Sequence, residues 1–171
     1  AELGWVSDEM FLLEQLPARV VVVGAGFIAC EFACILKGLG VEVIQLVRGD
    51  HLLRGFDREA ARAVQEGMEA DGIEIRFAHS PAAISGVPGQ LNVTTEAGEQ
   101  ISCGGVLLAT GRRPFLEGLT LEAAGIATEA DRIPVDGEQC TNVRHIFAVG
   151  DVTDRINLTP VAIDEGRAFA D

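Results

Sequence analysis

The stretch from Arg19 to Arg54 constrains the fold more than any other part of the chain. It reads RVVVVGAGFIACEFACILKGLGVEVIQLVRGDHLLR. Valines 20–23 form a short apolar run of the kind that is buried on both faces of a parallel sheet. Apolar residues then recur with helical spacing, and a second β-branched run covers Val41 to Val47. This pattern is typical of a strand–helix–strand unit of about 30 residues.

The glycine motif GAGFIA lies where the first expected strand gives way to the helix. Gly24 permits the tight turn, Gly26 lets a pyrophosphate approach the backbone, and Ala29 stands at the helix–strand contact where a third glycine is often found. The helix N-terminus offers unpaired N–H groups and a partial positive charge to phosphates. The structural alternative is a turn that only lets a helix pack closely on its strand. The position between strand and helix favours a dinucleotide-binding site.

The residues after the second strand indicate which dinucleotide binds. An NAD site usually has Asp or Glu there, because a carboxylate accepts hydrogen bonds from the ribose hydroxyls. This chain has Val47 followed by Arg48, with Arg54 six residues later. Two guanidiniums can bind a 2′-phosphate through forked donors, although both could also be ordinary exposed arginines. The missing acid and the paired bases favour NADPH.

Composition and charge exclude several classes of partner. The 171 residues suffice for one sizeable core or one domain with part of another, and 48% hydrophobic residues with 20 glycines suit an α/β protein. The net charge of −13 argues against nucleic acid and anionic membranes as partners. An anionic cofactor therefore needs a local basic cluster, to which Arg58 could also contribute. Glu31 interrupts the longest apolar run, so no membrane span is expected. The chain begins at Ala without a signal-peptide pattern, so we expect an excised part of a longer, cytoplasmic protein.

The four cysteines show neither zinc-ligand spacing nor a disulfide framework, and no metal site is expected. Cys30 and Cys34 would share one helix face, with Cβ atoms about 5–6 Å apart. A disulfide needs about 3.5–4.5 Å between those atoms. For these two, and for Cys103 and Cys140, we expect the role of small buried hydrophobic residues in a reducing compartment.

Turn and cap signals place the remaining elements of the first two thirds of the chain. Ser7 and Asp8 signal a short helix on an arm that Pro17 closes. Asp57 can cap a helix that runs to about Ala70. Strands are expected at residues 73–77 and 106–109, and a β-meander is expected at residues 82–87, 91–94 and 100–103.

The last third of the chain begins after ATGRRP and ends in a helix. Residues 117–124 are expected to be helical, and residues 133–135 an edge strand. HIFAVGD is expected to be a strand that delivers Asp151 at its tip, where α/β sheets contact ligands. A solvated turn residue is the alternative for Asp151. Thr159 and Pro160 are expected at the N-cap and first position of the final helix, residues 161–170.

Four motifs, in order along the chain, resemble those of one family. They are GAGFIACEFACILKGLG, LVRGDHLLRGFD, ATGRRP and HIFAVGDVTDRINLTPVAIDEGRA. Together they closely resemble glutathione reductases, which are FAD-dependent pyridine nucleotide–disulfide oxidoreductases. The LTPVA run and the two arginines favour this group over dihydrolipoamide dehydrogenases. The resemblance implies a connecting arm (1–17), a Rossmann-like NADPH-binding α/β domain with a parallel sheet and a β-meander insert (18–113), and a returning segment of the FAD-binding domain (114–171).

The resemblance also implies roles for individual residues toward NADPH. Phe27 and Glu31 are one helical turn apart and would both face the nicotinamide. Phe27 stands where the family usually has a tyrosine that covers the flavin, so the ring could act as a lid without the hydroxyl. Glu31 would pair with a lysine upstream of this chain. The residues expected to hold NADPH are Gly24, Gly26, Ile28, Ala29, Arg48 and Arg54, with Gly111 nearby.

Three further residues are implied to contact FAD in the full-length enzyme. Asp151 would bind the ribityl chain, and Arg112 would contribute to the flavin surroundings. The Thr159 N–H, at a helix start, would face the pyrimidine oxygen of the flavin and stabilise negative charge there.

Several parts of the family's electron route are missing from this chain. It has no N-terminal FAD fingerprint, no C-x-x-x-x-C disulfide and no C-terminal dimerisation domain with a His–Glu pair. The histidines His51, His79 and His145 match no catalytic position. The parent enzyme is expected to be a homodimer, and this chain alone is expected to be inactive and to self-associate through exposed apolar surface. Two alternatives stay open: a reductase of a related disulfide, such as a modified glutathione or trypanothione, and a stand-alone nucleotide-binding module without catalysis.

Overall fold

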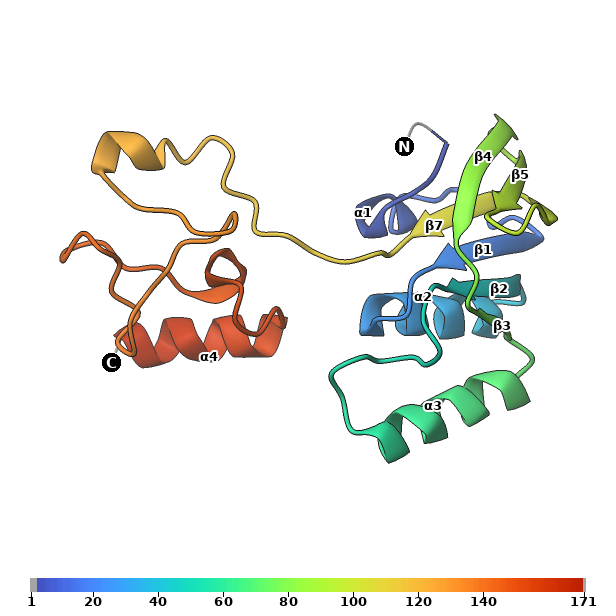
Figure 1. The fold of residues 1–171 in the computed structure, drawn as a ribbon, viewed down its shortest axis with the longest axis horizontal. Helices are drawn as coiled ribbons and strands as arrows, with labels where there is room; N and C mark the ends of the chain where they lie inside the picture. The colour runs from blue at the N-terminus through green and yellow to red at the C-terminus, as the bar shows by residue number, and fades with distance from the viewer. Residues whose placement is uncertain (1–2, 171) are drawn as a thin grey trace. The chain divides into compact units, whose positions relative to one another are not determined.

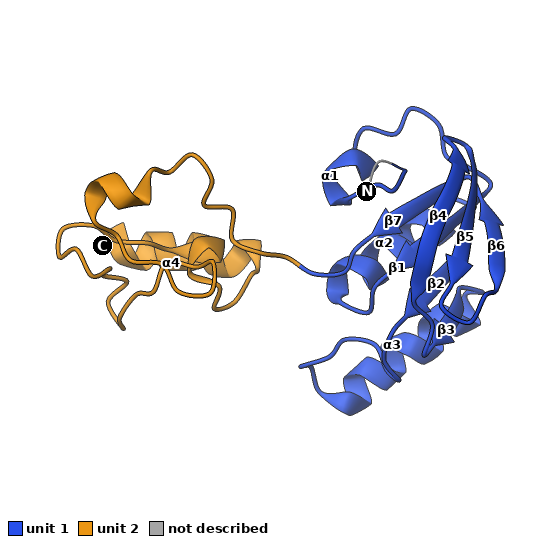
Figure 2. Cartoon of the chain, turned by 45° about the horizontal axis from the view of Figure 1, so that its top comes forward, with its two compact units in different colours: residues 1–111 blue, residues 112–171 orange. Residues whose placement is uncertain are grey.

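The chain folds as two units, residues 1–111 and 112–171 (Figure 2). The structure, a computed structural model, describes residues 3–170. The division follows Gly111, inside ATGRRP, and the arm before the first strand belongs to the first unit. The predicted class is confirmed, because the first unit combines a parallel sheet with a β-meander.

The first unit is organised around a parallel sheet with the strand order β3-β2-β1-β7 (Figure 1). Its strands are β1 (Arg19–Val23), β2 (Glu42–Val47), β3 (Glu74–Phe77) and β7 (Gly105–Leu108). In β1, Val21 is in register with Ile44 of β2 and with Val106 of β7. The valines of β1 are buried on both faces of the sheet, as the apolar run predicted.

Two helices form the crossovers between these parallel strands. Helix α2 (Phe27–Gly38) connects β1 to β2, and α3 (Arg58–Ala70) connects β2 to β3. Asp57 caps α3 because its Oδ1 accepts hydrogen bonds from two N–H groups in the first turn, both at 3.0 Å. Gly72 then takes a φ of +84° just after the helix. The predicted start and stop of this helix are therefore confirmed.

The β-meander covers the face of the parallel sheet opposite α2. It consists of antiparallel strands β4 (Pro81–Val87), β5 (Gln90–Thr95) and β6 (Gln100–Cys103), which confirms the predicted insert. Alternate valines of β1 enter two separate clusters, because side chains of a strand point to opposite faces. Val20 and Val22 pack with residues of α2, whereas Val21 and Val23 pack with residues of the meander.

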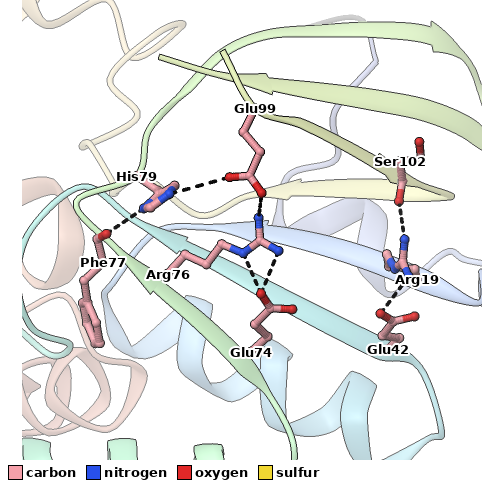
Figure 3. A network of polar contacts seen from close by, with 8 residues as sticks. All are labelled: Arg19, Glu42, Glu74, Arg76, Phe77, His79, Glu99 and Ser102. Carbon is pink, nitrogen blue, oxygen red and sulfur yellow. Dashed lines mark hydrogen bonds and ion pairs between the residues drawn. The ribbon is translucent and has the colours of Figure 1, made fainter. Parts of the chain in front are cut away.

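Two polar networks connect the meander to the parallel sheet (Figure 3). Arg76 of β3 pairs with Glu74 at 2.7 Å and also with Glu99, which precedes β6. Arg19 of β1 pairs with Glu42 at 2.8 Å and donates to the Ser102 carbonyl at 3.0 Å. The bond to Glu74 raises the pKa of Arg76, so this link keeps its charge. The two layers are therefore joined at two separate places, one on β1 and one on β3.

The arm before β1 packs against the edge of the sheet. Trp5 forms a parallel bridge with Leu107, through Trp5 N–H to the Val106 carbonyl at 2.7 Å and Leu108 N–H to the Trp5 carbonyl at 2.8 Å. The predicted short helix is α1 (Ser7–Met10), but its N-cap is Val6 instead of Ser7 or Asp8. The Val6 N–H donates to the Glu9 carboxylate at 2.6 Å, so the third helical residue supplies the capping bond.

The second unit has little regular structure within residues 112–170. It contains two 3₁₀ turns, η1 (Leu121–Ala124) and η2 (Gly150–Thr153), and helix α4 (Thr159–Ala170). Its buried apolar cluster contains Leu121, Ile133 and Ala148. Hydrogen bonds from the backbone to polar side chains hold the loops of this unit. For example, Asp136 Oδ1 accepts from the Glu138 N–H at 2.9 Å and from the Cys140 N–H at 3.0 Å.

Three predictions for the second unit are wrong or only partly right. Residues 133–135 form no strand, and residues 145–151 form only a single bridge, Cys140 to Phe147, before η2. A strand needs a paired neighbour, and here the apolar side chains of both segments enter the small cluster instead. Residues 117–124 are helical only in η1, because Gly118 and Thr120 adopt left-handed φ values of +82° and +48°.

Candidate nucleotide-binding site

The candidate site lies at the carboxyl ends of β1, β2 and β7, where the glycine turn follows β1. Gly24 N–H donates to the Leu46 carbonyl at 3.0 Å, and Ala109 N–H donates to the Val23 carbonyl at 2.8 Å. Gly24 has a φ of +141°, and a Cβ at this position would lie 2.2 Å from the Ala109 carbonyl oxygen. Only glycine fits this turn, because any side chain would collide with the backbone that follows β7.

The turn leads directly into the N-terminus of α2. Gly26 is the N-cap, with φ −80° and ψ 175° and no side-chain capping bond, and its carbonyl accepts from Cys30 N–H at 3.1 Å. A Cβ on Gly26 would meet nothing within 4 Å, so open space lies beside this residue. The first turn of α2 carries no acidic residue. This helix end is therefore suited to a phosphate group.

Four other predicted residues lie on α2. Ala29 is fully buried, and its Cβ would be 3.4 Å from a Cβ built on Gly24, so this pair sets the close helix–strand approach. Phe27 and Ile28 are half-buried, whereas Glu31 is exposed. Phe27 and Glu31 lie on successive turns of one helix face.

The loop after β2 folds back onto the glycine turn. The Leu53 N–H donates to the Ala25 carbonyl at 2.7 Å, and Leu52 is fully buried in the cluster beneath α2. Arg48 and Arg54 flank these anchoring residues; both are exposed, and neither forms an ion pair within residues 3–170. The structure thus brings the loop that carries both arginines into contact with the turn, while their guanidiniums stay available to an anion.

The loop also carries Asp50, an acid that is already paired. Asp50 Oδ1 lies 2.6 Å from His51 Nδ1, and this hydrogen bond lowers the pKa of Asp50. His51 therefore has a partner, as expected for a satisfied histidine. His79 likewise bonds the Phe77 carbonyl at 2.7 Å.

Sequence reasoning missed Gln45, a fully buried residue of β2 below the turn. Its Nε2 donates to the Gly24 carbonyl at 2.9 Å and lies 3.9 Å from Cys30 Sγ. The available signal was a polar residue inside the run VEVIQLV, beyond the Glu42 at its start. Apolar periodicity alone gives no reason to select it.

The three implied FAD contacts lie in the second unit. Gly111, which is implied to lie near NADPH, has a φ of +141° and ends the first unit. Arg112 Nη2 and Asp151 Oδ2 form an ion pair of 2.9 Å. Asp151 belongs to η2 rather than to a strand tip, and η2 is held to α4 by Gly150 N–H donating to Glu165 Oε2 at 2.7 Å. The prediction that Thr159 is the N-cap is wrong by one residue. α4 begins at Thr159, and the Leu158 carbonyl accepts from Ala162 N–H at 3.0 Å.

The cysteines only partly follow the predicted pattern. All four are free, and Cys30 and Cys103 are buried, but Cys34 is exposed and Cys140 is half-buried. Burial raises the pKa of the Cys30 and Cys103 thiols, so both stay protonated at neutral pH.

Within residues 3–170, no group of three or more His, Cys, Asp or Glu side chains could hold a metal ion. None of the helices that the structure describes is both long and apolar enough to cross a membrane.

A glycine turn entering a helix at the carboxyl edge of a parallel sheet defines a dinucleotide-binding fold. The model of the family described as pyridine nucleotide-disulphide oxidoreductase matches residues 4–166, so the chain belongs to that family.

Two relatives and one solved structure show how similar the chain is to known proteins. A glutathione reductase of Nostoc sp. is 43% identical over 99% of this chain, and the match covers 40% of the relative. A trypanothione reductase of Trypanosoma congolense is 41% identical over 96% of this chain and 35% of its own length. The HOCl-induced flavoprotein disulfide reductase RclA of Escherichia coli, solved as a Cu(II) complex of a cysteine-to-serine mutant, superposes with a TM-score of 0.90 at 29% identity, over 98% of this chain and 38% of that one. The chain therefore spans about two fifths of these proteins or less.

Proposed function

We propose that the chain is the NADPH-binding portion of a glutathione-reductase-like flavoenzyme. In that enzyme, reducing equivalents pass from NADPH through FAD and a redox disulfide to oxidised glutathione. The observation that carries the proposal is the contact between the glycine turn and the loop of Arg48 and Arg54, through Leu53 N–H and the Ala25 carbonyl. The glycine turn at the start of α2 suits a pyrophosphate, and the loop that carries Arg48 and Arg54 suits a 2′-phosphate.

The residues present fit NADPH. The space beside Gly26 would take the pyrophosphate. Arg48 and Arg54, which form no ion pair within residues 3–170, would take the 2′-phosphate. Phe27 and Glu31 would lie along the path to the nicotinamide, with the phenyl ring of Phe27 as a cover that excludes water. When bound, NADPH supplies a hydride; Gly24, Gly26, Ile28 and Ala29 serve only to shape and orient its site.

The second unit would complete an FAD site in the full-length enzyme. Asp151 would accept a hydrogen bond from the ribityl chain, since its Oδ2 pairs with Arg112 while its Oδ1 accepts no hydrogen bond within residues 3–170. The N-terminus of α4 at Thr159 would supply an N–H donor and a favourable helix dipole. Gly111, in the first unit, would let the backbone pass close to NADPH rather than FAD.

The substrate is proposed from the names of the relatives, and two alternatives remain. A related disulfide is supported by the match to a trypanothione reductase. A stand-alone nucleotide-binding module is the second alternative. The sequence of the full-length gene distinguishes an enzyme from a stand-alone module. An enzyme requires a C-x-x-x-x-C upstream and a His–Glu pair downstream of this chain. We further propose a homodimeric, cytoplasmic parent enzyme and an inactive isolated chain.

Calorimetric titration of the chain with 2′,5′-ADP and with 5′-AMP tests the cofactor assignment. A charge-assisted hydrogen bond contributes about 1.5–3 kcal/mol, and less at an exposed site. We therefore expect roughly a ten- to a few-hundredfold preference for 2′,5′-ADP, and its loss in the double variant Arg48→Ala/Arg54→Ala.

The matched control is Arg62→Ala/Arg144→Ala, which removes the same charge from two exposed arginines outside the loop. This control should keep the preference. Equal binding of both nucleotides by the unmodified chain would contradict the NADPH assignment, and binding of neither would contradict the whole site.

A further inference from the structure

Gln45 makes one strong interaction and leaves one polar atom unpaired. It is 0% exposed, and its Nε2 donates to the Gly24 carbonyl, but its Oε1 has no hydrogen-bond partner within residues 3–170. A buried acceptor without a donor is costly. An apolar side chain of the same length would avoid that cost, so stability alone does not account for a glutamine here. The bond to the glycine turn is the feature that remains to be explained.

That bond fixes the orientation of a peptide group in the turn. The Gly24 carbonyl belongs to the peptide between Gly24 and Ala25, which is trans. In a planar trans peptide the C=O and N–H bonds point in opposite directions. Because Gln45 holds the carbonyl toward the buried side of β2, the Ala25 N–H points away from it. Within the part of the chain that the structure describes, this N–H donates to no backbone carbonyl.

The next peptide of the turn is fixed in the same manner. The Ala25 carbonyl accepts from Leu53 N–H at 2.7 Å, so the Gly26 N–H points away from Leu53. Two successive N–H donors are thereby oriented, one by a buried side chain and one by the loop after β2. Donors that are fixed before a ligand arrives bind it more tightly, because less ordering is needed on binding.

We propose that Gln45 is a positioning residue that holds the Ala25 N–H ready to bind the pyrophosphate of a dinucleotide. This inference rests on the proposed function of the site. Without the Gln45 amide, the glycine peptide can rotate and turn its carbonyl oxygen, which repels phosphate, toward the ligand. Gln45 itself does not touch the nucleotide, and it has no part in the choice between NADP⁺ and NAD⁺.

The test is the variant Gln45→Met, which keeps a flexible side chain of similar length but no donor. Calorimetric titration should show that affinity for NADP⁺ and for NAD⁺ falls by the same factor, about five- to twentyfold. Their affinity ratio should stay unchanged, because the 2′-phosphate contacts come from the loop. The melting temperature should stay the same or rise, because the unpaired Oε1 is removed. A purely structural role would lower it instead.

Thr95→Val is the matched control. Thr95 is 2% exposed, and its hydroxyl accepts from Glu99 N–H at 3.1 Å in the meander, so this change also removes a buried side-chain bond. It should leave both affinities unchanged. Full affinity in a folded Gln45→Met variant would overturn the inference and leave the proposed function intact, whereas an unmodified chain that binds neither dinucleotide would overturn both.

A measurement on the unmodified chain keeps the inference testable if Gln45→Met does not fold. In ¹H–¹⁵N correlation spectra, NADP⁺ should shift the Ala25 amide resonance downfield, as a new hydrogen bond to phosphate requires. An Ala25 resonance that does not move while NADP⁺ binds would overturn the proposal.

Discussion

The two units are stabilised by different means. In the first, a parallel sheet is covered on both faces, and two clusters of buried residues lie on either side of β1. In the second, three residues are buried in one cluster, and the loops depend on polar side chains that bond the backbone. Large apolar side chains such as Phe115, at 75% exposed, and Phe169, at 49%, remain accessible.

This difference in buried apolar surface indicates different roles for the two units. Burial of apolar area is the main favourable term in folding, so the first unit has what a stable nucleotide-binding domain needs. The second unit leaves apolar side chains exposed, which is typical of a surface that binds another part of a protein. The arm shares this property, since Phe11 and Leu12 are 80% and 78% exposed. Both observations agree with the exposed apolar surface that was expected of segments flanking the nucleotide domain.

The largest effect is expected from Gly24→Ala compared with Gly26→Ala. The first should destabilise the first unit by about 3–5 kcal/mol, because the new Cβ would lie 2.2 Å from a carbonyl oxygen at a φ of +141°. The second should change stability by no more than about 1 kcal/mol, because the gain from backbone angles that suit alanine is opposed by alanine being a poorer N-cap residue than glycine. Trp5, the only tryptophan and part of the first unit, reports unfolding by fluorescence in urea.

Nucleotide titration of the same two variants distinguishes an effect on folding from an effect on nucleotide binding. Gly26→Ala should stay folded but lose affinity for 2′,5′-ADP, since its methyl group would enter the space proposed for phosphate. Equal stability of the two alanine variants would contradict the role given to the Gly24 turn.

A smaller effect is expected from truncating one core residue in each unit. Leu36 is 1% exposed in the first unit and Leu121 is 9% exposed in the second. Leu36→Ala should lower the unfolding free energy reported by Trp5 by about 2–5 kcal/mol. Leu121→Ala should change that value by less than about 0.5 kcal/mol, because each cluster contains residues of its own unit only. Equal shifts in the two variants would show that the units unfold as one.

The smallest effect concerns the reactivity of the cysteines with a disulfide reagent. In the folded chain Cys140 and Cys34 should be labelled, whereas Cys30 and Cys103 should react only when the first unit unfolds. Partial burial, and then the charge of Asp71, raises the pKa of the Cys34 thiol. Its thiolate therefore forms at higher pH than an ordinary thiolate, and its labelling rate should still rise above about pH 8.5. Mass spectrometry of labelled peptides measures each site; early labelling of Cys30 would contradict a closed core.

Most of the first unit was predictable because its signals are local. The run of valines, the Asp57 cap and the glycines of the meander each specify their element without reference to distant residues. The second unit was less predictable, because the expected strand at residues 145–151 depends on a neighbour that residues 112–170 do not supply as a strand. Left-handed angles at Thr120 and Asp154 likewise have no simple sequence signal.

The residue types of the candidate site were predicted, but the buried hydrogen bond that holds its glycine turn was not. The glycine turn and the basic loop follow from motif and spacing, and the roles of Arg48 and Arg54 stay predictions until a ligand is titrated. The bond from Gln45 to the Gly24 carbonyl joins β2 to the turn after β1, and these two segments are adjacent only in the fold. Periodicity treats a buried strand residue as apolar, so it passes over the one amide that bonds the turn.

The bridge between Trp5 and Leu107 has a consequence for solubility. β7 is the last strand on its side of the parallel sheet, and an open strand edge can pair with another chain and start aggregation. The arm occupies the Val106 carbonyl and the Leu108 N–H on that edge, and the indole covers Gly105, where any side chain would collide with it. A chain shortened to begin at β1 would expose this edge, so the segment around Trp5 protects the domain against intermolecular β-pairing.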